Sequence, residues 1–254
     1  MIPVTACWAG IFPVKSAGEH IATGHTMNRS ISENRSAKAI LINMLLATGS
    51  LFLNGFGVFL TIHADIGAAP WDVFNLGLSK TLGILYGNVS ISVSLAVLLV
   101  DILMKEPIGI AMFIDTVVVG KAVDFFDRIR IIPAPKSFPG SVIMMLTGLW
   151  VMGYTQFFYM SASLGCGPRD TLLVGLKKRL SKIPIGVVSI FLLGLVTLIG
   201  SLLGGKVGIG TLICAFGTGP IMQFAFHSVH FDAAGICHQR LRESGKILLA
   251  ALKK

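Results

Sequence analysis

The chain has 254 residues, of which 54% are hydrophobic and only 13% are charged, and its mean hydropathy is +0.79. This composition excludes an ordinary soluble domain and indicates an integral membrane protein whose first partner is the lipid bilayer. The net charge of +9 is typical of a membrane protein whose loops on the inner side are rich in Lys and Arg. We expect no nucleic-acid binding, because the sequence has no basic patch interleaved with aromatic residues.

Residues 1–38 contain no long apolar run and mix Lys, Glu, His and Arg. They lack the apolar core and the small-residue cleavage site of a signal peptide, so we expect a cytoplasmic leader that is followed by a helix acting as the insertion signal. The composition changes at Met27, so Met1 and Met27 are both candidate starts of translation.

Six apolar runs of about twenty residues follow, which is the length that a helix needs to cross a bilayer. These runs are Ala39–Ile62, Leu85–Met104, Pro107–Phe126, Gly140–Ala162, Ile183–Gly204 and Val207–His227. The sequence therefore predicts an all-α, polytopic membrane helix bundle of about six transmembrane helices. Residues 127–139 form the connecting loop and residues 228–254 a basic C-terminal tail, and both termini are expected to be cytoplasmic.

One motif occurs twice in the chain. The stretch ADIGAAPWD (Ala64 to Asp72) and the stretch ASLGCGPRD (Ala162 to Asp170) share an alanine, a glycine, a proline and an aspartate at the same spacing. Further matches at nearly the same offset make residues 39–126 and 140–227 two homologous membrane repeats.

Each motif opens a short segment, Pro70–Gly83 in the first repeat and Pro168–Leu180 in the second. About a dozen residues with charges among them are too few for an ordinary span. If these short helices are re-entrant, the repeats have opposite orientations in the membrane, and if they cross, the repeats are parallel.

The motif residues suit the start of a helix at membrane depth. Gly67 and Gly165 permit backbone angles that other residues avoid, and the proline that follows each of them fits a first helical turn. Asp72 and Asp170 then meet the unsatisfied N–H groups and the positive end of the helix dipole. Two interpretations remain: the aspartates only cap the helices, or the two broken helices meet near the bilayer midplane and line a polar site.

The two motifs differ beside their aspartates, where the first has Trp71 and the second has Arg169. A guanidinium in the membrane needs a carboxylate or an anionic ligand, and Asp72, Asp115 or Asp124 could supply the carboxylate. Alternatively, Arg169 lies at the cytoplasmic interface and follows the positive-inside rule.

The run Pro107–Phe126 carries Asp115, Lys121 and Asp124, an unusual load for a membrane span. Lys121 and Asp124 share a helix face, which predicts an internal ion pair. Asp115 lies on another face and is a candidate for proton or cation coupling, against the alternative of a hydrogen bond to a neighbouring helix.

Three stretches resemble the YczE/YitT-type bacterial integral membrane proteins, particularly the YczE branch: GAAPWDVFNLGLSKTLGILYG, GCGPRDTLLVGLKKRL and GGKVGIGTLICAFGTGPIMQ. The resemblance implies a multi-pass protein of the bacterial cytoplasmic (inner) membrane and no settled activity. It also draws attention to Thr211 and Gln223. The substrate- or ion-binding candidates are therefore Trp71, Asp72, Asp115, Arg169, Asp170, Thr211 and Gln223.

The expected function is secondary transport of a small molecule, for example an anionic metabolite, by two pseudo-symmetric repeats. No P-loop, Ser-x-x-Lys, HExxH or GxSxG pattern occurs, so we expect no enzyme activity, no cofactor, no catalytic residue and no metal site. The alternative is a non-transporting binding subunit or a regulatory scaffold. A partner protein would then bind the basic loop Lys177–Lys182 and the tail, and a homo-oligomer is also compatible with the sequence.

Overall fold

The computed structural model describes residues 37–229, and this part of the chain is helical throughout, with short connections and no strand. Its helices are α3 (Ala37–His63), α4 (Pro70–Leu82), α5 (Tyr86–Leu103), α6 (Ile110–Ile129), α7 (Phe138–Ser161), α8 (Pro168–Arg179), α9 (Ile185–Leu202) and α10 (Ile209–Ser228). The predictions made for residues 1–36, for Met27 as a start and for the tail from residue 230 lie outside the described residues.

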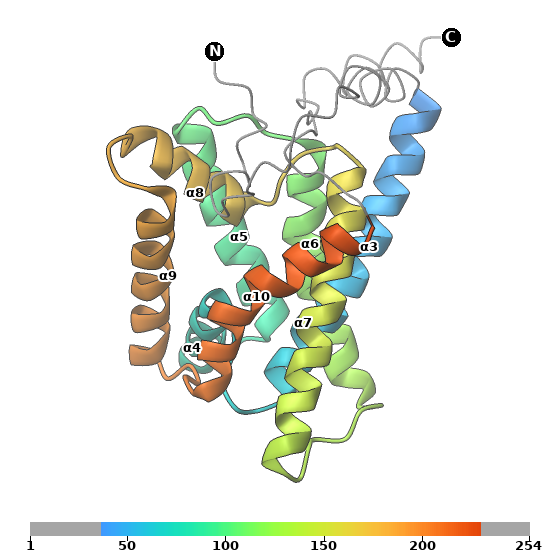
Figure 1. Ribbon diagram of the computed structural model, residues 1–254, viewed down its shortest axis with the longest axis vertical. Coiled ribbons are helices and arrows are strands. Elements are labelled where there is room, and N and C mark those ends of the chain that lie inside the picture. Colours follow the sequence, from blue (N-terminus) through green and yellow to red (C-terminus); the bar gives the residue numbers. More distant parts are fainter. Residues whose placement is uncertain (1–36, 230–254) are drawn as a thin grey trace.

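The helices differ in length and in placement (Figure 1). Long helices such as α3 and α7 run along the long axis of the molecule, and α10 crosses it obliquely, whereas the short helices α4 and α8 lie toward opposite ends. The all-α membrane bundle predicted from the sequence is confirmed, and both predicted short helices are present as separate elements that begin at Pro70 and Pro168.

The surface of this bundle is suited to lipid. Five of the described helices, α3, α5, α7, α9 and α10, are long and apolar enough to cross a membrane. Their outer faces expose large apolar side chains, such as Leu45 at 74% and Leu202 at 79%. A contiguous apolar surface of this kind is unfavourable in water and is expected where a protein meets acyl chains. The sixth predicted span, Pro107–Phe126, corresponds to α6. This helix carries Asp115, Lys121 and Asp124 and is not one of the five.

Glycines allow the helices inside the bundle to approach closely. On α4 and α9, a Cβ added to Gly77 would lie 2.3 Å from the Gly200 carbonyl oxygen. On α3 and α7, a Cβ added to Gly57 would lie 2.9 Å from the Gly148 carbonyl oxygen. In lipid, the hydrophobic effect does not drive helices together, so van der Waals contact between closely packed backbones is a principal source of stability.

We predict that Gly200→Ala destabilises the protein, because the new Cβ would lie 2.5 Å from the Cα of Phe74 and force α4 and α9 apart. Overpacking of this kind costs about 1–3 kcal/mol. Gly194→Ala on the same helix is the control, since no atom lies within 4 Å of the new Cβ. Thermal unfolding in detergent should show a lower midpoint for Gly200→Ala than for Gly194→Ala. Equal midpoints would contradict the α4–α9 packing described here.

Candidate functional site

Two connections of the same shape lead into the short helices. After α3, Asp65 has a φ of 58° and Gly67 a φ of 121°, and after α7, Ser163 has a φ of 56° and Gly165 a φ of 131°. The glycine angles lie in a region that residues with a side chain rarely adopt, which confirms the prediction made for both glycines.

Each connection is tied to the start of a helix from the other half of the chain. The amide of Gly210 donates a hydrogen bond to the carbonyl of Ile66 at 2.9 Å, and the amide of Ala111 donates to the carbonyl of Leu164 at 3.2 Å. The predicted span begins at Pro107, but α6 begins at Ile110, because the backbone is still extended at Gly109. These contacts satisfy backbone groups that an apolar environment could not.

Asp72 and Asp170 lie in the first turns of α4 and α8, two residues after Pro70 and Pro168, as the motif predicts. The N-cap residues of these helices, Ala69 and Gly167, provide no side-chain hydrogen bond. Asp72, which is 3% exposed, accepts a hydrogen bond from the hydroxyl of Tyr86 at 2.7 Å. Its carboxylate therefore joins a side-chain network as well as facing the helix dipole.

Arg169 pairs with Asp72, one of the three carboxylates that the sequence offered as partners. Its Nη1 lies 3.9 Å from Asp72 Oδ1, and its guanidinium carbon lies 5.2 Å from the centroid of the Trp71 ring. Nη2 also donates to the hydroxyl of Ser90 at 3.5 Å. The starts of α4 and α8 thus meet through one ion pair and one cation–π contact.

Asp115 and Asp170 both lie close to Gly167, the residue before α8. A Cβ added to Gly167 would lie 3.0 Å from Oδ2 of Asp115 and 3.5 Å from Oδ2 of Asp170. Both carboxylates interact electrostatically with Arg169, as Asp72 does. Five of the seven predicted site residues therefore form one cluster, which we call the arginine cluster: Trp71, Asp72, Asp115, Arg169 and Asp170.

The other two predicted residues have different surroundings. Thr211 is buried in the first turn of α10, where its hydroxyl accepts a hydrogen bond from the Gly208 amide at 3.3 Å. It lies against Gly67, so it supports the connection into α4. Gln223 is exposed further along α10, and the structure does not bring it to the arginine cluster.

The predicted ion pair between Lys121 and Asp124 is wrong. Lys121 donates to the amide oxygen of Asn88 at 2.8 Å, whereas Asp124 accepts from the backbone N–H of Gly87 at 2.8 Å. Both contacts are with the first turn of α5, whose free N–H groups compete for a carboxylate on the adjacent helix.

Three polar residues on α5 are buried that were not among the residues predicted for the site: Ser90, Ser94 and Asp101. Tyr86 and Ser90, which both contact the arginine cluster, are four residues apart and share a helix face with Ser94. This spacing of polar residues within an apolar span is the signal that could have found them.

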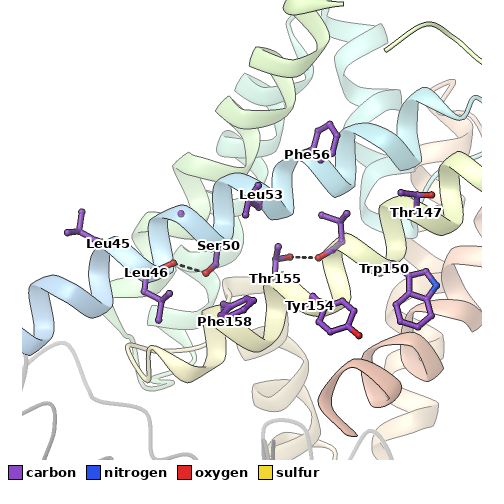
Figure 2. A pocket seen from close by; sticks show the side chains of 12 residues that line it. Leu45, Leu46, Ser50, Leu53, Phe56, Thr147, Trp150, Tyr154, Thr155 and Phe158 are labelled. Atoms are coloured by element: carbon purple, nitrogen blue, oxygen red, sulfur yellow. Dashed lines mark hydrogen bonds between the residues drawn. The ribbon is translucent and has the colours of Figure 1, made fainter. Parts of the chain in front are cut away.

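An apolar groove lies elsewhere, between α3 and α7 (Figure 2). Its lining includes Leu45, Leu53, Trp150 and Phe158, all partly exposed on the outer surface of the bundle. The hydroxyl of Ser50 in the groove is already bonded to the Leu46 carbonyl. The groove therefore offers a surface for acyl chains and no charged group that could recognise a polar solute.

Residues 41–227 match the family model described as a family of unknown function (DUF6198). The chain belongs to this family. A Haemophilus influenzae protein is 31% identical over 69% of this chain and 79% of its own length. The Bacillus subtilis membrane protein YczE is 32% identical, over 69% of this chain and 81% of its own length, which confirms the predicted resemblance. The Bacillus subtilis protein YyaS is 26% identical over 67% and 85%, and no solved structure matches the chain.

We predict that Asp72 and Arg169 are energetically coupled. Asp72→Asn and Arg169→Gln should each destabilise the protein, because each leaves the other charge without its partner. The double variant should lose less than the sum, by about 0.5–3 kcal/mol. Unfolding in mild detergent with increasing denaturant would measure the three differences.

The exposed ion pair of Asp65 with Lys206 provides the matched control, with side chains that are 72% and 55% exposed. The cycle Asp65→Asn with Lys206→Gln should give a coupling of about 0–1 kcal/mol. Strict additivity at Asp72 and Arg169 would show that their proximity does not stabilise the junction between α4 and α8.

Proposed function

We propose that the protein is a secondary transporter of a small anionic solute, and that the solute binds where α4 and α8 begin. The observation that carries this proposal is the arginine cluster itself: a guanidinium held between two broken helices in a protein with a lipid-facing surface. Ionisable groups at such positions are costly and usually serve a ligand or an ion. The proposal includes no enzyme activity.

The arrangement of the helices supports two repeats of opposite orientation, each with three crossings and one re-entrant helix. The short helix α4 packs against α9, and the short helix α8 packs against α5, so each contacts the long helix that follows the other. The two short helices lie near opposite ends of the molecule (Figure 1). The paired connections at Gly67 and Gly165 add a correspondence in backbone conformation. Inverted repeats with broken helices are common among secondary transporters.

The surroundings of Arg169 favour an anionic solute. Its side chain is 28% exposed, and its contacts at 3.9 Å and 3.5 Å are too long to engage its donors fully. A guanidinium presents five N–H groups in a planar fork that fits a carboxylate or a phosphate. The N-termini of α4 and α8 add positive potential at the same place.

The alternative function, a scaffold that docks a partner on the basic loop, has less support. Lys178 pairs with Glu106, Lys177 donates to the Ser181 and Ile183 carbonyls, and Arg179 donates to the Met104 carbonyl. These cations are used in contacts within the chain, so fewer donors remain for a partner protein.

We predict that Arg169→Lys abolishes or strongly weakens solute uptake while the protein still inserts and folds, because lysine keeps the charge but loses the planar fork. Everted and right-side-out vesicles from a strain lacking the protein would be compared with complemented vesicles, with a panel of labelled carboxylates and organic phosphates. The control is Arg128→Lys, since Arg128 is exposed in the last turn of α6. Uptake by Arg169→Lys at the wild-type rate would exclude the guanidinium as the binding group.

We predict a topology with six crossings, in which the connection between α6 and α7 is outside the cell. In a cysteine-free background, Lys136→Cys should react with an impermeant maleimide in intact cells. Ser181→Cys, in the connection between α8 and α9, should react only after permeabilisation, and it controls for cell integrity. Protection of position 136 in intact cells would instead support eight crossings, with α4 and α8 also spanning the membrane.

A further inference from the structure

Asp101 is the most isolated charged side chain in the part of the chain that the structure describes. It lies near the end of α5, its exposed fraction is 0%, and neither of its carboxylate oxygens has a hydrogen-bond partner. None of the contacts described for the arginine cluster uses it. An ionised carboxylate in this environment would lose its hydration with no hydrogen bond or ion pair to compensate for it.

The charged groups near Asp101 make the ionised form still less favourable. Glu106, after the end of α5, and Asp170, on α8, are the two that interact with it electrostatically, and both are acidic. Of the cations at this end, Lys178 is paired with Glu106, and Lys105, which follows α5, is exposed. Arg179 on α8 donates to the Met104 carbonyl.

On α6 and α4, which also pack against α5, the charged groups that contact α5 do so at its other end. On α6, Lys121 and Asp124 contact the first turn of α5 through Asn88 and Gly87. On α4, Asp72 contacts Tyr86 in the same turn. None of these contacts reaches Asp101, so no described cation compensates its charge.

Asp101 is connected to the arginine cluster through two elements. Along α5 it stands seven residues after Ser94, hence on the same face as the buried hydroxyls of Ser94 and Ser90. Across to α8 it interacts with Asp170, which itself interacts with Asp115 and Arg169. The unpaired carboxylate thus interacts with an acidic residue of the proposed binding site.

We infer that Asp101 holds an exchangeable proton and passes it to Asp170, which makes this pair the proton-coupling site of the transporter. In the transfer, the O–H bond of the Asp101 carboxyl breaks and an O–H bond forms on a carboxylate oxygen of Asp170. Asp101 becomes the carboxylate and Asp170 the neutral acid, and no other reactant is needed. The inference rests on the proposed function only in naming the proton as the coupling ion. The protonated state of Asp101 itself is independent of any solute.

The test is infrared difference spectroscopy of the purified full chain in lipid nanodiscs, with the pH varied and no solute present. The wild-type protein should show the carbonyl stretching band of protonated carboxylic acid, and this band should be weaker in Asp101→Asn by the contribution of one carboxyl group. Asp65→Asn is the matched control, because Asp65 is exposed and paired with Lys206. A band of wild-type intensity in Asp101→Asn would overturn the inference.

Two further measurements keep the test decisive if Asp101→Asn does not fold. Wild-type protein labelled with ¹³C at aspartate carboxyls should show the band shifted in frequency, and an unshifted band would exclude every aspartate. In Asp170→Asn the band should disappear at a lower pH than in the wild type, because a nearby negative charge that favours protonation is removed. An unchanged midpoint would overturn the partnership with Asp170. Since none of these measurements needs transport, a failed uptake assay and a failed proton assay remain distinguishable.

Discussion

The fold depends on one constraint: a backbone that breaks inside an apolar bundle must find its hydrogen bonds within the protein. The two connections after α3 and α7 meet this constraint by bonding to the first turns of α10 and α6. The helix starts that follow present free N–H groups and positive potential, which draw carboxylates to the same place. Arg169 is tolerated there because Asp72 neutralises it and Trp71 covers it. Each feature of the arginine cluster thus follows from the broken helices.

The helix α5 links the local constraint to the rest of the molecule. Its first turn provides the Tyr86 hydroxyl for Asp72 and the Gly87 amide for Asp124, and its far end holds Asp101 beside α8. Its buried polar side chains lie on one face, while residues such as Leu103, 72% exposed, face outward. One apolar span can therefore insert as an ordinary transmembrane helix and still connect the two short helices. Close glycine contacts, such as Gly87 with Gly120 on α6, keep it in register.

The sequence was most informative where a residue type has one physical use. Gly67 and Gly165 adopt the angles that only glycine tolerates well, and Pro70 and Pro168 begin the short helices, as predicted. Prediction failed where the outcome depended on a neighbouring helix. Lys121 and Asp124 are adjacent on α6, yet the free donor and acceptor groups of α5 separate them. Periodicity shows which face a side chain occupies but not which helix it meets, so the partners of Arg169 and the isolation of Asp101 required the three-dimensional arrangement.

The balance of charge around Arg169 constrains any mechanism that uses it. One guanidinium interacts with three carboxylates, those of Asp72, Asp115 and Asp170, and Asp101 interacts in turn with Asp170. If every carboxylate were ionised, the site would be strongly negative before an anion arrived, and the anion would be repelled in a medium of low dielectric constant. Protonation of the carboxylates would reduce this repulsion, because each proton neutralises one negative charge. Under the proposed function, an anion that bound the guanidinium would release Asp72 from its ion pair, and a protonated Asp72 could stay buried at lower cost. In the proposed transporter, binding of the anion and binding of the proton would therefore favour each other, which is the thermodynamic requirement for moving the two together.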